Sequence, residues 1–398
     1  MSAATVTRGS RLFVLASVGW FVSWQLATLF GANRQLTVVL GLYGFVFHMV
    51  LGKAYALVPS YFDRELAFPR APLAHLPLAL IGTAGLTADA SGVALEPIGA
   101  SLIRTASLSA WGVGCLVLVG ALGWSIRDNL TGRETGTSQA KADYLGIDRF
   151  ANAFVPVAFG YLLVGSLLPV VDGLGVATPI PIRGPQITHV LAVGTATLLV
   201  FALGFRLLPR FLAAHPRRWL VAVVLPAGAA GPLLLVIGFG SGSLFRLGAV
   251  VQTLALAGFA VAYVDMFRRS DRRRLGLYAV LCAVGAAIAV ALLGTSMAIT
   301  GVSPELATAH VRLGLLGFLG VTIVGVSYQF YPPNVARIPG VDDRTAALAV
   351  GLLVAGVGIE VLSLVGAIDL LTAVGRLLAL FGASLHGVIL IAVLRSRS

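Results

Sequence analysis

The sequence predicts an all-α membrane protein that crosses the bilayer about twelve times. Three observations support this fold class. Of the 398 residues, 58% are apolar and only 11% are charged, whereas soluble domains carry about 25% charged residues. Apolar runs of about twenty residues, each long enough to cross a bilayer, recur along the chain. Three of these runs also share one residue pattern, which indicates an internal repeat.

The expected spans leave little room for a soluble domain, so residues 1–398 are predicted to form a single transmembrane domain. The first apolar run, which starts near Arg11, is long for the core of a cleavable signal peptide and lacks a clear small-residue cleavage site. We therefore expect a retained helix there. The spans are expected at residues 11–31, 36–60, 73–90, 101–126, 149–172, 186–209, 218–240, 244–267, 274–300, 306–332, 345–368 and 370–394.

Basic residues give these spans an orientation. Arginine and lysine gather at both ends of the chain and in every second connection, and the net charge of +12 arises there. This charge therefore indicates no nucleic-acid partner. The positive-inside rule predicts that both termini are cytoplasmic, in the plasma membrane of the cell. The longest polar connection, the expected cytoplasmic loop 127–148, follows the fourth span. It divides the chain into three groups of four, at residues 11–126, 149–267 and 274–394.

The repeated pattern lies in the second span of each group. It consists of a histidine, a glycine fifteen residues later and a proline a few residues further on. The matching residues are His310, Gly325 and Pro332 in the tenth span, His189, Gly204 and Pro209 in the sixth, and Thr37, Gly52 and Pro59 in the second. Small residues in an apolar span allow close approach to a neighbouring helix or a flat cofactor. Prolines should end the helices.

The tenth-span stretch, HVRLGLLGFLGVTIVGVSYQFYPP, resembles the tenth helix of subunit I of the heme-copper oxidases, especially the cbb-type oxidases and nitric oxide reductases. That family has twelve helices in three quasi-equivalent arcs of four. Its second, sixth and tenth helices carry metal ligands near the outer side of the membrane. The resemblance is strong in the tenth span, fair in the sixth and weak in the second.

The resemblance implies one heme and an incomplete set of other ligands. His310 matches the proximal ligand of the high-spin heme, and His189 matches a copper ligand. Arg312 and Thr37 stand where the family has its two low-spin heme ligands. Two further copper histidines are absent, since residues 218–242 contain none, which makes copper a doubtful cofactor.

These substitutions imply a divergent relative of the family. It would bind one b-type heme and a diatomic gas, nitric oxide or oxygen, rather than pump protons. If it is an enzyme, it is a heme-dependent oxidoreductase. A membrane redox partner and a homo-oligomer are possible partners besides the lipid bilayer.

Each candidate residue also has a plainer interpretation. His310 could be an interfacial histidine bonded to a loop, and His189 could line a gas pocket, bind a lone metal or have no function. His48 and His386 could together hold a displaced heme or metal. We favour two separately hydrogen-bonded histidines there. Tyr328 follows the family pattern, but core packing with a locally bonded hydroxyl is the preferred interpretation.

Charged groups inside the membrane should be paired, because an isolated charge is costly in lipid. Arg312 and Glu360 are expected to form a structural ion pair, with a heme propionate as the other partner considered for Arg312. Asp265 is expected to pair with the neighbouring Arg268 and Arg269. Two further expectations concern single residues. Arg206 should extend its charge towards the interface, and His75 should face solvent.

Two other classes of function stay open. A transporter or permease would fit twelve spans and cytoplasmic termini, but secondary transporters are commonly built from two repeated halves. The third possibility is a cofactor-free membrane partner protein that keeps the fold without its ligands.

Overall fold

The computed structural model describes residues 2–92, 99–178, 184–239, 242–366 and 368–397. These residues form helices and connecting loops, with no strand among them. The described part of the chain contains 12 helices that are long and apolar enough to cross a membrane. The prediction of an all-α, multi-pass membrane protein is therefore confirmed at this level.

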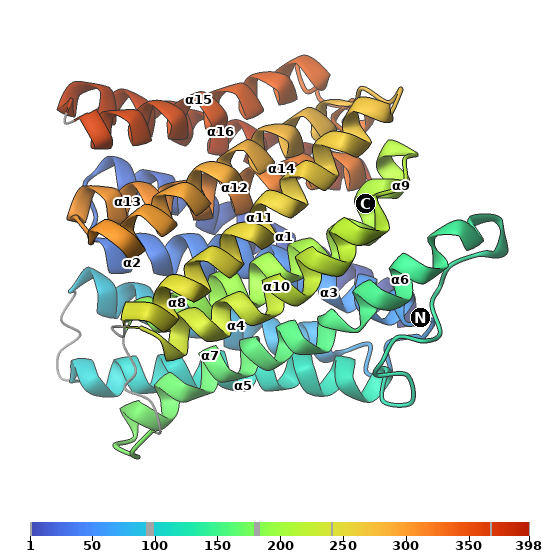
Figure 1. The fold of residues 1–398 in the computed structure, drawn as a ribbon, viewed down its shortest axis with the longest axis horizontal. Coiled ribbons are helices and arrows are strands. Elements are labelled where there is room, and N and C mark those ends of the chain that lie inside the picture. The colour runs from blue at the N-terminus through green and yellow to red at the C-terminus, as the bar shows by residue number, and fades with distance from the viewer. Residues whose placement is uncertain (1, 93–98, 179–183, 240–241, 367, 398) are drawn as a thin grey trace.

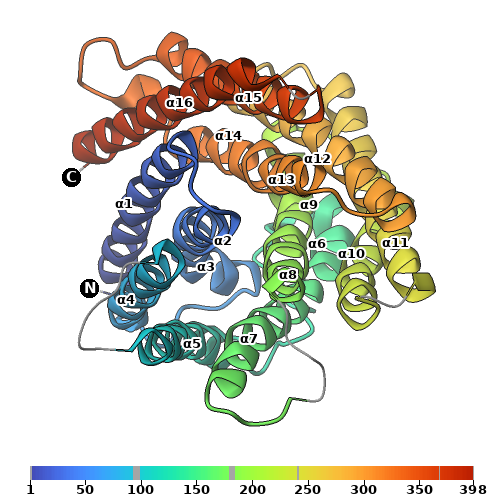
Figure 2. The same cartoon turned by 90° about the vertical axis from the view of Figure 1, so that its left-hand side faces the viewer.

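Nine of these membrane-length helices form an outer ring (Figure 2). Each contacts the next around the ring, and the last contacts the first. In this order they are α1 (Ser2–Leu29), α4 (Ala71–Ser91), α5 (Ala100–Ser125), α7 (Phe154–Gly173), α10 (Arg218–Ile237), α11 (Gly242–Arg269), α12 (Leu275–Thr300), α15 (Asp343–Gly366) and α16 (Asp369–Ser396).

The other three spans lie inside the ring, and they are the three stretches that share the residue pattern (Figure 2). In each inner span, 78% of the most apolar window is buried, against 33–56% in the outer helices. The inner spans are α2 (Arg34–Val38), η1 (Val39–Phe47) and α3 (His48–Tyr61); α8 (Gly184–His189), η3 (Val190–Thr197) and α9 (Leu198–Leu212); and α13 (Pro304–Arg312), η4 (Leu313–Gly320) and α14 (Val321–Phe330).

Every inner span contains a π-helical segment at about the same place in the repeat. The segments η1, η3 and η4 also contact one another at the centre of the molecule. A π-helix is rare, and it occurs frequently at functional sites because its wider turn changes the direction of side chains. The centre of the ring is thus built from three copies of an unusual local structure.

The repeated glycines bring the inner spans close to the ring. A methyl group added at Gly325 would lie 2.6 Å from the carbonyl oxygen of Gly276, and one added at Gly276 would lie 2.3 Å from the carbonyl oxygen of Gly325. At the matching Gly52, the added carbon would lie 2.3 Å from Cβ of Phe13. The pattern therefore marks backbone positions that only glycine can occupy without a shift of the neighbour.

The arginine-rich connections and both termini lie at one end of the bundle, on the right in Figure 1. The connection after α5 is folded there and contains the 3₁₀ turn η2 (Gln139–Tyr144) and α6 (Leu145–Asn152). Asn129 donates to the carbonyl oxygen of Phe62 at 2.9 Å. Arg64 pairs with Asp128 at 2.9 Å and with Glu134 at 2.7 Å. Arg64 also lowers the pKa of Asp128 by hydrogen bonding to its charged form.

Two expectations about charged groups are corrected at this end. Arg206 does not reach outward: it is 3% exposed, donates to Asn152 and lies 3.6 Å from the buried carboxylate of Asp148. Asp265 pairs with Arg269 at 2.6 Å, but its second partner is Arg217 at 3.3 Å rather than Arg268. Both partners, Asp148 and Arg217, lie far from these residues in the sequence, and the helix packing brings them near.

Two short helical elements complete the chain. The 3₁₀ turn η5 (Pro333–Val335) follows the last inner span, and α6 precedes α7 without a long loop. The prolines of the repeat lie at the expected places. Pro59 and Pro209 are within three residues of the ends of α3 and α9, and Pro332 follows the end of α14.

Candidate histidine site

His189 and His310 face each other at the end of the bundle opposite the arginine-rich connections. His189 is the last residue of α8, and His310 lies in the last turn of α13. Their ring centroids are 6.4 Å apart, and their ring planes differ by 24°. The structure therefore brings together two residues that are 121 positions apart and that the sequence repeat had aligned.

Backbone carbonyls fix the tautomer of both rings. Nδ1 of His189 donates to the carbonyl oxygen of Pro185 at 2.7 Å, and Nδ1 of His310 donates to that of Val290 at 3.1 Å. A carbonyl can only accept, so in each neutral ring Nδ1 carries the proton and Nε2 keeps the lone pair. A backbone partner of this kind is the usual means by which a protein orients a metal-binding imidazole.

The neighbours of the two rings hold them in place. His189 packs against Phe239, with ring centroids 6.4 Å apart. A methyl group added at Gly294 would lie 2.9 Å from Cε1 of His310. The ring of His310 can therefore occupy this position because residue 294 is a glycine. No group of three or more histidine, cysteine, aspartate or glutamate side chains with metal-binding spacing occurs among the described residues. The donor set at this site is therefore two imidazoles.

Arg312 lies two residues after His310 in the sequence, but its side chain joins Glu360 in a separate buried cluster. Nε of Arg312 donates to Oε2 of Glu360 at 2.7 Å, and Nη2 donates to Gln25 at 2.9 Å. Arg376 donates to the other oxygen of Glu360 at 3.0 Å. Arg312 is 2% exposed and Glu360 is fully buried. The carboxylate thus joins arginines from the tenth and twelfth spans.

Aromatic side chains occupy the region around Arg312 where the resemblance implies a second heme in the family. The guanidinium of Arg312 lies 5.0 Å from the ring centre of Trp24. Phe21 and Phe45 stack at 4.0 Å with an interplanar angle of 8°. Trp24 lies over Gly41, where an added methyl group would meet the indole at 2.7 Å. This packing fills the space beside the Arg312 guanidinium with aromatic side chains.

Thr37, the second-span position that matches the two histidines, makes only a local contact. Its hydroxyl donates to the carbonyl oxygen of Arg34, one helical turn earlier, at 2.9 Å. Hydroxyl-to-backbone bonds within a helix are common for threonine. The first copy of the repeat therefore supplies no ligand at the position where the other two copies supply an imidazole.

His48 and His386 make separate hydrogen bonds and have different neighbours. Nδ1 of His48 donates to the carbonyl oxygen of Tyr43 at 2.9 Å, and its ring packs against the aromatic side chains of Phe13, Trp20 and Trp111. His386 is hydrogen-bonded through Nδ1 to the hydroxyl of Tyr328 at 3.0 Å. These contacts match the interpretation of two separately hydrogen-bonded histidines. Tyr328 is buried as expected, but the expectation that its hydroxyl bonds locally is wrong, because its partner His386 lies 58 residues away.

A second buried tyrosine–histidine pair escaped the sequence analysis. The hydroxyl of Tyr55 lies 3.2 Å from Nδ1 of His75, and His75 is fully buried. The expectation that His75 faces solvent is therefore wrong. Tyr55 and Tyr328 both lie three residues after the repeat glycine, Gly52 and Gly325. This shared offset was the signal that could have revealed the pair from the sequence.

Comparisons with known proteins add no relative. No family model matches the chain, and no curated protein was found that is similar to it in sequence.

Proposed function

We propose that this chain is a divergent relative of subunit I of the heme-copper oxidases, which binds one b-type heme at His310 and responds to a diatomic gas, nitric oxide or oxygen. The observation that carries the proposal is the facing pair of His310 and His189, whose Nδ1 atoms are fixed by backbone carbonyls. When bound, the heme iron would supply a redox-active centre that can take a gas ligand.

The chemistry of the donor set fits heme iron better than a bare metal ion. Protein sites for zinc usually supply three or four side-chain ligands, whereas the described residues offer two imidazoles here. A porphyrin provides four nitrogens of its own, so one or two axial histidines are enough. The neutral Nε2 lone pairs are the atoms that would bind the iron.

The separation of the rings suggests that both histidines can serve one metal. The ring centroids are 6.4 Å apart, so His310 and His189 would together hold a heme iron, which would supply the redox chemistry. His189 would then occupy the position that a gas ligand needs. Gas binding would require His189 to move away, and Phe239 is the side chain that packs against this ring.

The same proposal excludes two features of the oxidases. Aromatic side chains pack around Arg312, which supports the proposal of a single heme. The pairing of Arg312 with Glu360 favours a structural role for this arginine over a contact with a propionate. Copper is not proposed, because His189 has no histidine partner on the seventh span to complete such a site.

The proposed architecture is three quasi-equivalent groups of four helices with cytoplasmic termini in the plasma membrane, and with loop 127–148 in the cytoplasm. Its support is threefold. The third and fourth helices of every group pack on each other, the fourth contacts the first of the next group, and the second lies inside the ring with a π-helical segment. Cytoplasmic termini agree with the arginine-rich connections at the same end (Figure 1).

The direct test is an absorption spectrum of the detergent-purified protein, oxidised and reduced with dithionite, after expression with ample heme. We expect a Soret band in the wild type that is lost in His310→Ala. His215→Ala is the matched control, since His215 is exposed and stacks on Tyr144 at 4.1 Å, in a region where no heme is proposed.

Two results would contradict the proposal in different ways. A Soret band that survives in His310→Ala would place the heme elsewhere, for example at His48 or His386. No band in heme-supplied wild-type protein would leave a cofactor-free membrane partner or a transporter. The tight packing of the inner helix α14 at Gly325 against the outer helix α12 at Gly276 is the observation that would then favour the cofactor-free alternative.

A further inference from the structure

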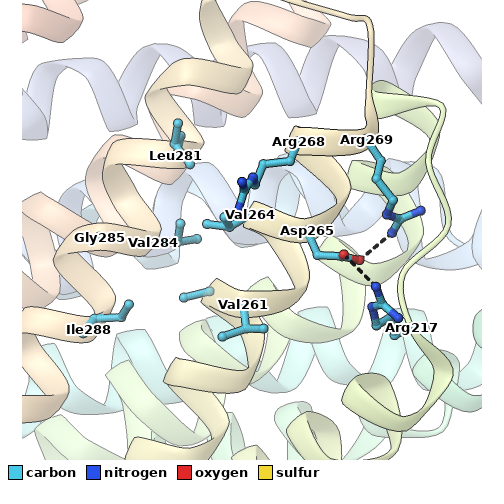
Figure 3. Close-up of a pocket in the computed structure, with 11 residues that line it drawn as sticks. Arg217, Val261, Val264, Asp265, Arg268, Arg269, Leu281, Val284, Gly285 and Ile288 are labelled. Carbon is cyan, nitrogen blue, oxygen red and sulfur yellow. Dashed lines mark hydrogen bonds and ion pairs between the residues drawn. The ribbon is translucent and has the colours of Figure 1, made fainter.

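A groove runs along the outside of the ring between α11 and α12, at the end that carries the arginine-rich connections (Figure 3). Its volume is about 710 Å³. The walls are apolar, and they come from Val261 and Val264 on α11 and from Leu281 and Ile288 on α12. Because this face belongs to two membrane-length outer helices, the groove opens towards the hydrocarbon of the bilayer.

A glycine forms part of the groove floor. A methyl group added at Gly285 would have no atom within 4 Å, so the space beside this residue is open. The open space means that a larger side chain at Gly285 can extend into the groove without displacing the helices. A substitution at Gly285 can therefore test whether a molecule occupies the groove.

Positive charge gathers at the mouth of the groove. Arg217 and Arg269 both pair with Asp265, as Figure 3 shows. Arg268 is exposed, points towards the groove, and makes no hydrogen bond or ion pair within the part of the chain that is described. The mouth of the groove therefore holds three guanidinium groups and one carboxylate, and the excess positive charge favours an anion beside Arg268.

The dimensions match one leaflet of a bilayer. Val261 lies eight residues before Arg269, which is about 12 Å along a helix at ~1.5 Å per residue. Half of the hydrocarbon core of a bilayer is about 15 Å thick. The apolar part of the groove is therefore long enough to hold most of one acyl chain. The arginines then lie at the level of the headgroups.

We propose that this groove binds one anionic phospholipid, with an acyl chain along Gly285 and the phosphate on Arg268 beside Arg269. Cationic pockets between transmembrane helices are suited to anionic headgroups, and guanidinium groups form strong charge-assisted hydrogen bonds with phosphate oxygens. The site is separate from the histidine pair, which lies at the opposite end of the bundle. A neutral phospholipid has the same acyl chains and lacks the net charge that Arg268 recognises.

The test uses native mass spectrometry of the full chain in detergent, with an equal mixture of phosphatidylglycerol and phosphatidylcholine that carry identical acyl chains. The wild type should retain phosphatidylglycerol preferentially. Arg268→Gln should reduce this preference about fivefold, while the ion pairs of Asp265 stay intact. Arg70→Gln removes an exposed arginine far from the groove and should leave the preference unchanged.

The groove itself is tested by Gly285→Leu, which fills the acyl-chain site without changing any charge. It should reduce retention of phosphatidylglycerol at least as strongly as Arg268→Gln. Gly160→Leu, at another exposed glycine with no atom within 4 Å, is the control and should have no effect. Equal retention of the two lipids, or full retention in Gly285→Leu, would overturn the proposal. Displacement of the lipid by millimolar inorganic phosphate would also overturn it, because a simple anion would then suffice.

Discussion

At the scale of single residues, the chemistry of the inner spans depends on which nitrogen of each histidine carries the proton. In His189 and His310 a backbone carbonyl accepts a hydrogen bond from Nδ1–H, so the lone pair of Nε2 is available as a ligand in both rings. Nδ1 of His48 also donates to a backbone carbonyl, but its Nε2 is buried and lacks a hydrogen-bond partner among the described residues. His189 and His310 therefore face each other, whereas the ring of His48 faces aromatic side chains.

The two histidines of the site should respond differently to mutation. His310→Ala should lose the heme, because the proposal makes His310 the residue that holds it, whereas His189→Ala should keep it. Removal of His189 also opens the sixth position, so the apparent affinity of the reduced protein for carbon monoxide should rise by about tenfold or more. A carbon monoxide titration followed at the Soret band measures this change. An unchanged affinity in His189→Ala would show that His189 does not compete for the iron.

The Arg312–Glu360 pair allows a second prediction at this scale. Glu360→Gln leaves two arginines without their carboxylate, one of them fully enclosed. Loss of one partner of a buried ion pair costs about 3–5 kcal/mol of stability, whereas replacement of both partners by apolar residues costs much less. Denaturant titration of the helical signal in detergent should therefore show Glu360→Gln to be less stable than the double variant Arg312→Met/Glu360→Met. A double variant as unstable as the sum of its single variants would contradict the pairing.

At the scale of elements, the sequence was informative where a signal is periodic or charged. The spans and the alignment of His189 with His310 followed from apolar runs and repeated glycines, whereas the inner place of three spans came only from the structure. The π-helical segments did not, because a run such as LGLLGFLG is apolar on every side and carries no period that could reveal a widened turn. His75 and Arg206 were placed wrongly because proximity to a proline or a helix end was taken as exposure, while their distant partners, Tyr55 and Asp148, were not visible in the local sequence.

The crossing of α12 and α14 gives a prediction for the repeat glycines. Gly276→Ala would place a methyl group 2.3 Å from the carbonyl oxygen of Gly325, so the two helices must separate. Overpacking of this kind typically costs about 1–3 kcal/mol. Gly285→Ala is the matched control on the same helix, where the added methyl group meets open space and alanine favours the helix. If both variants unfold at the same denaturant concentration, the close contact at Gly276 contributes nothing to stability.

At the scale of the whole molecule, the orientation of the bundle decides from which side each site is reached. The histidine pair lies at one end, and the lipid groove, the termini and loop 127–148 lie at the other (Figure 1). Because cytoplasmic loops carry an excess of arginine and lysine, the histidine end should face the outside. A gas would then reach the pair from the outer leaflet, and the groove would meet the more anionic cytoplasmic leaflet.

Single cysteines can establish this orientation in intact cells. After replacement of Cys115 and Cys282 by alanine, Glu305→Cys reports on the start of α13, and Asp143→Cys reports on the loop before α6; both positions are exposed. A membrane-impermeant maleimide should label Glu305→Cys in intact cells and Asp143→Cys only after the membrane is opened. Both proteins should label fully after solubilisation, which controls for reactivity. The reverse pattern would put the termini outside, expose the phospholipid groove to the outer leaflet, and require the histidine pair to exchange ligands with the cytoplasm.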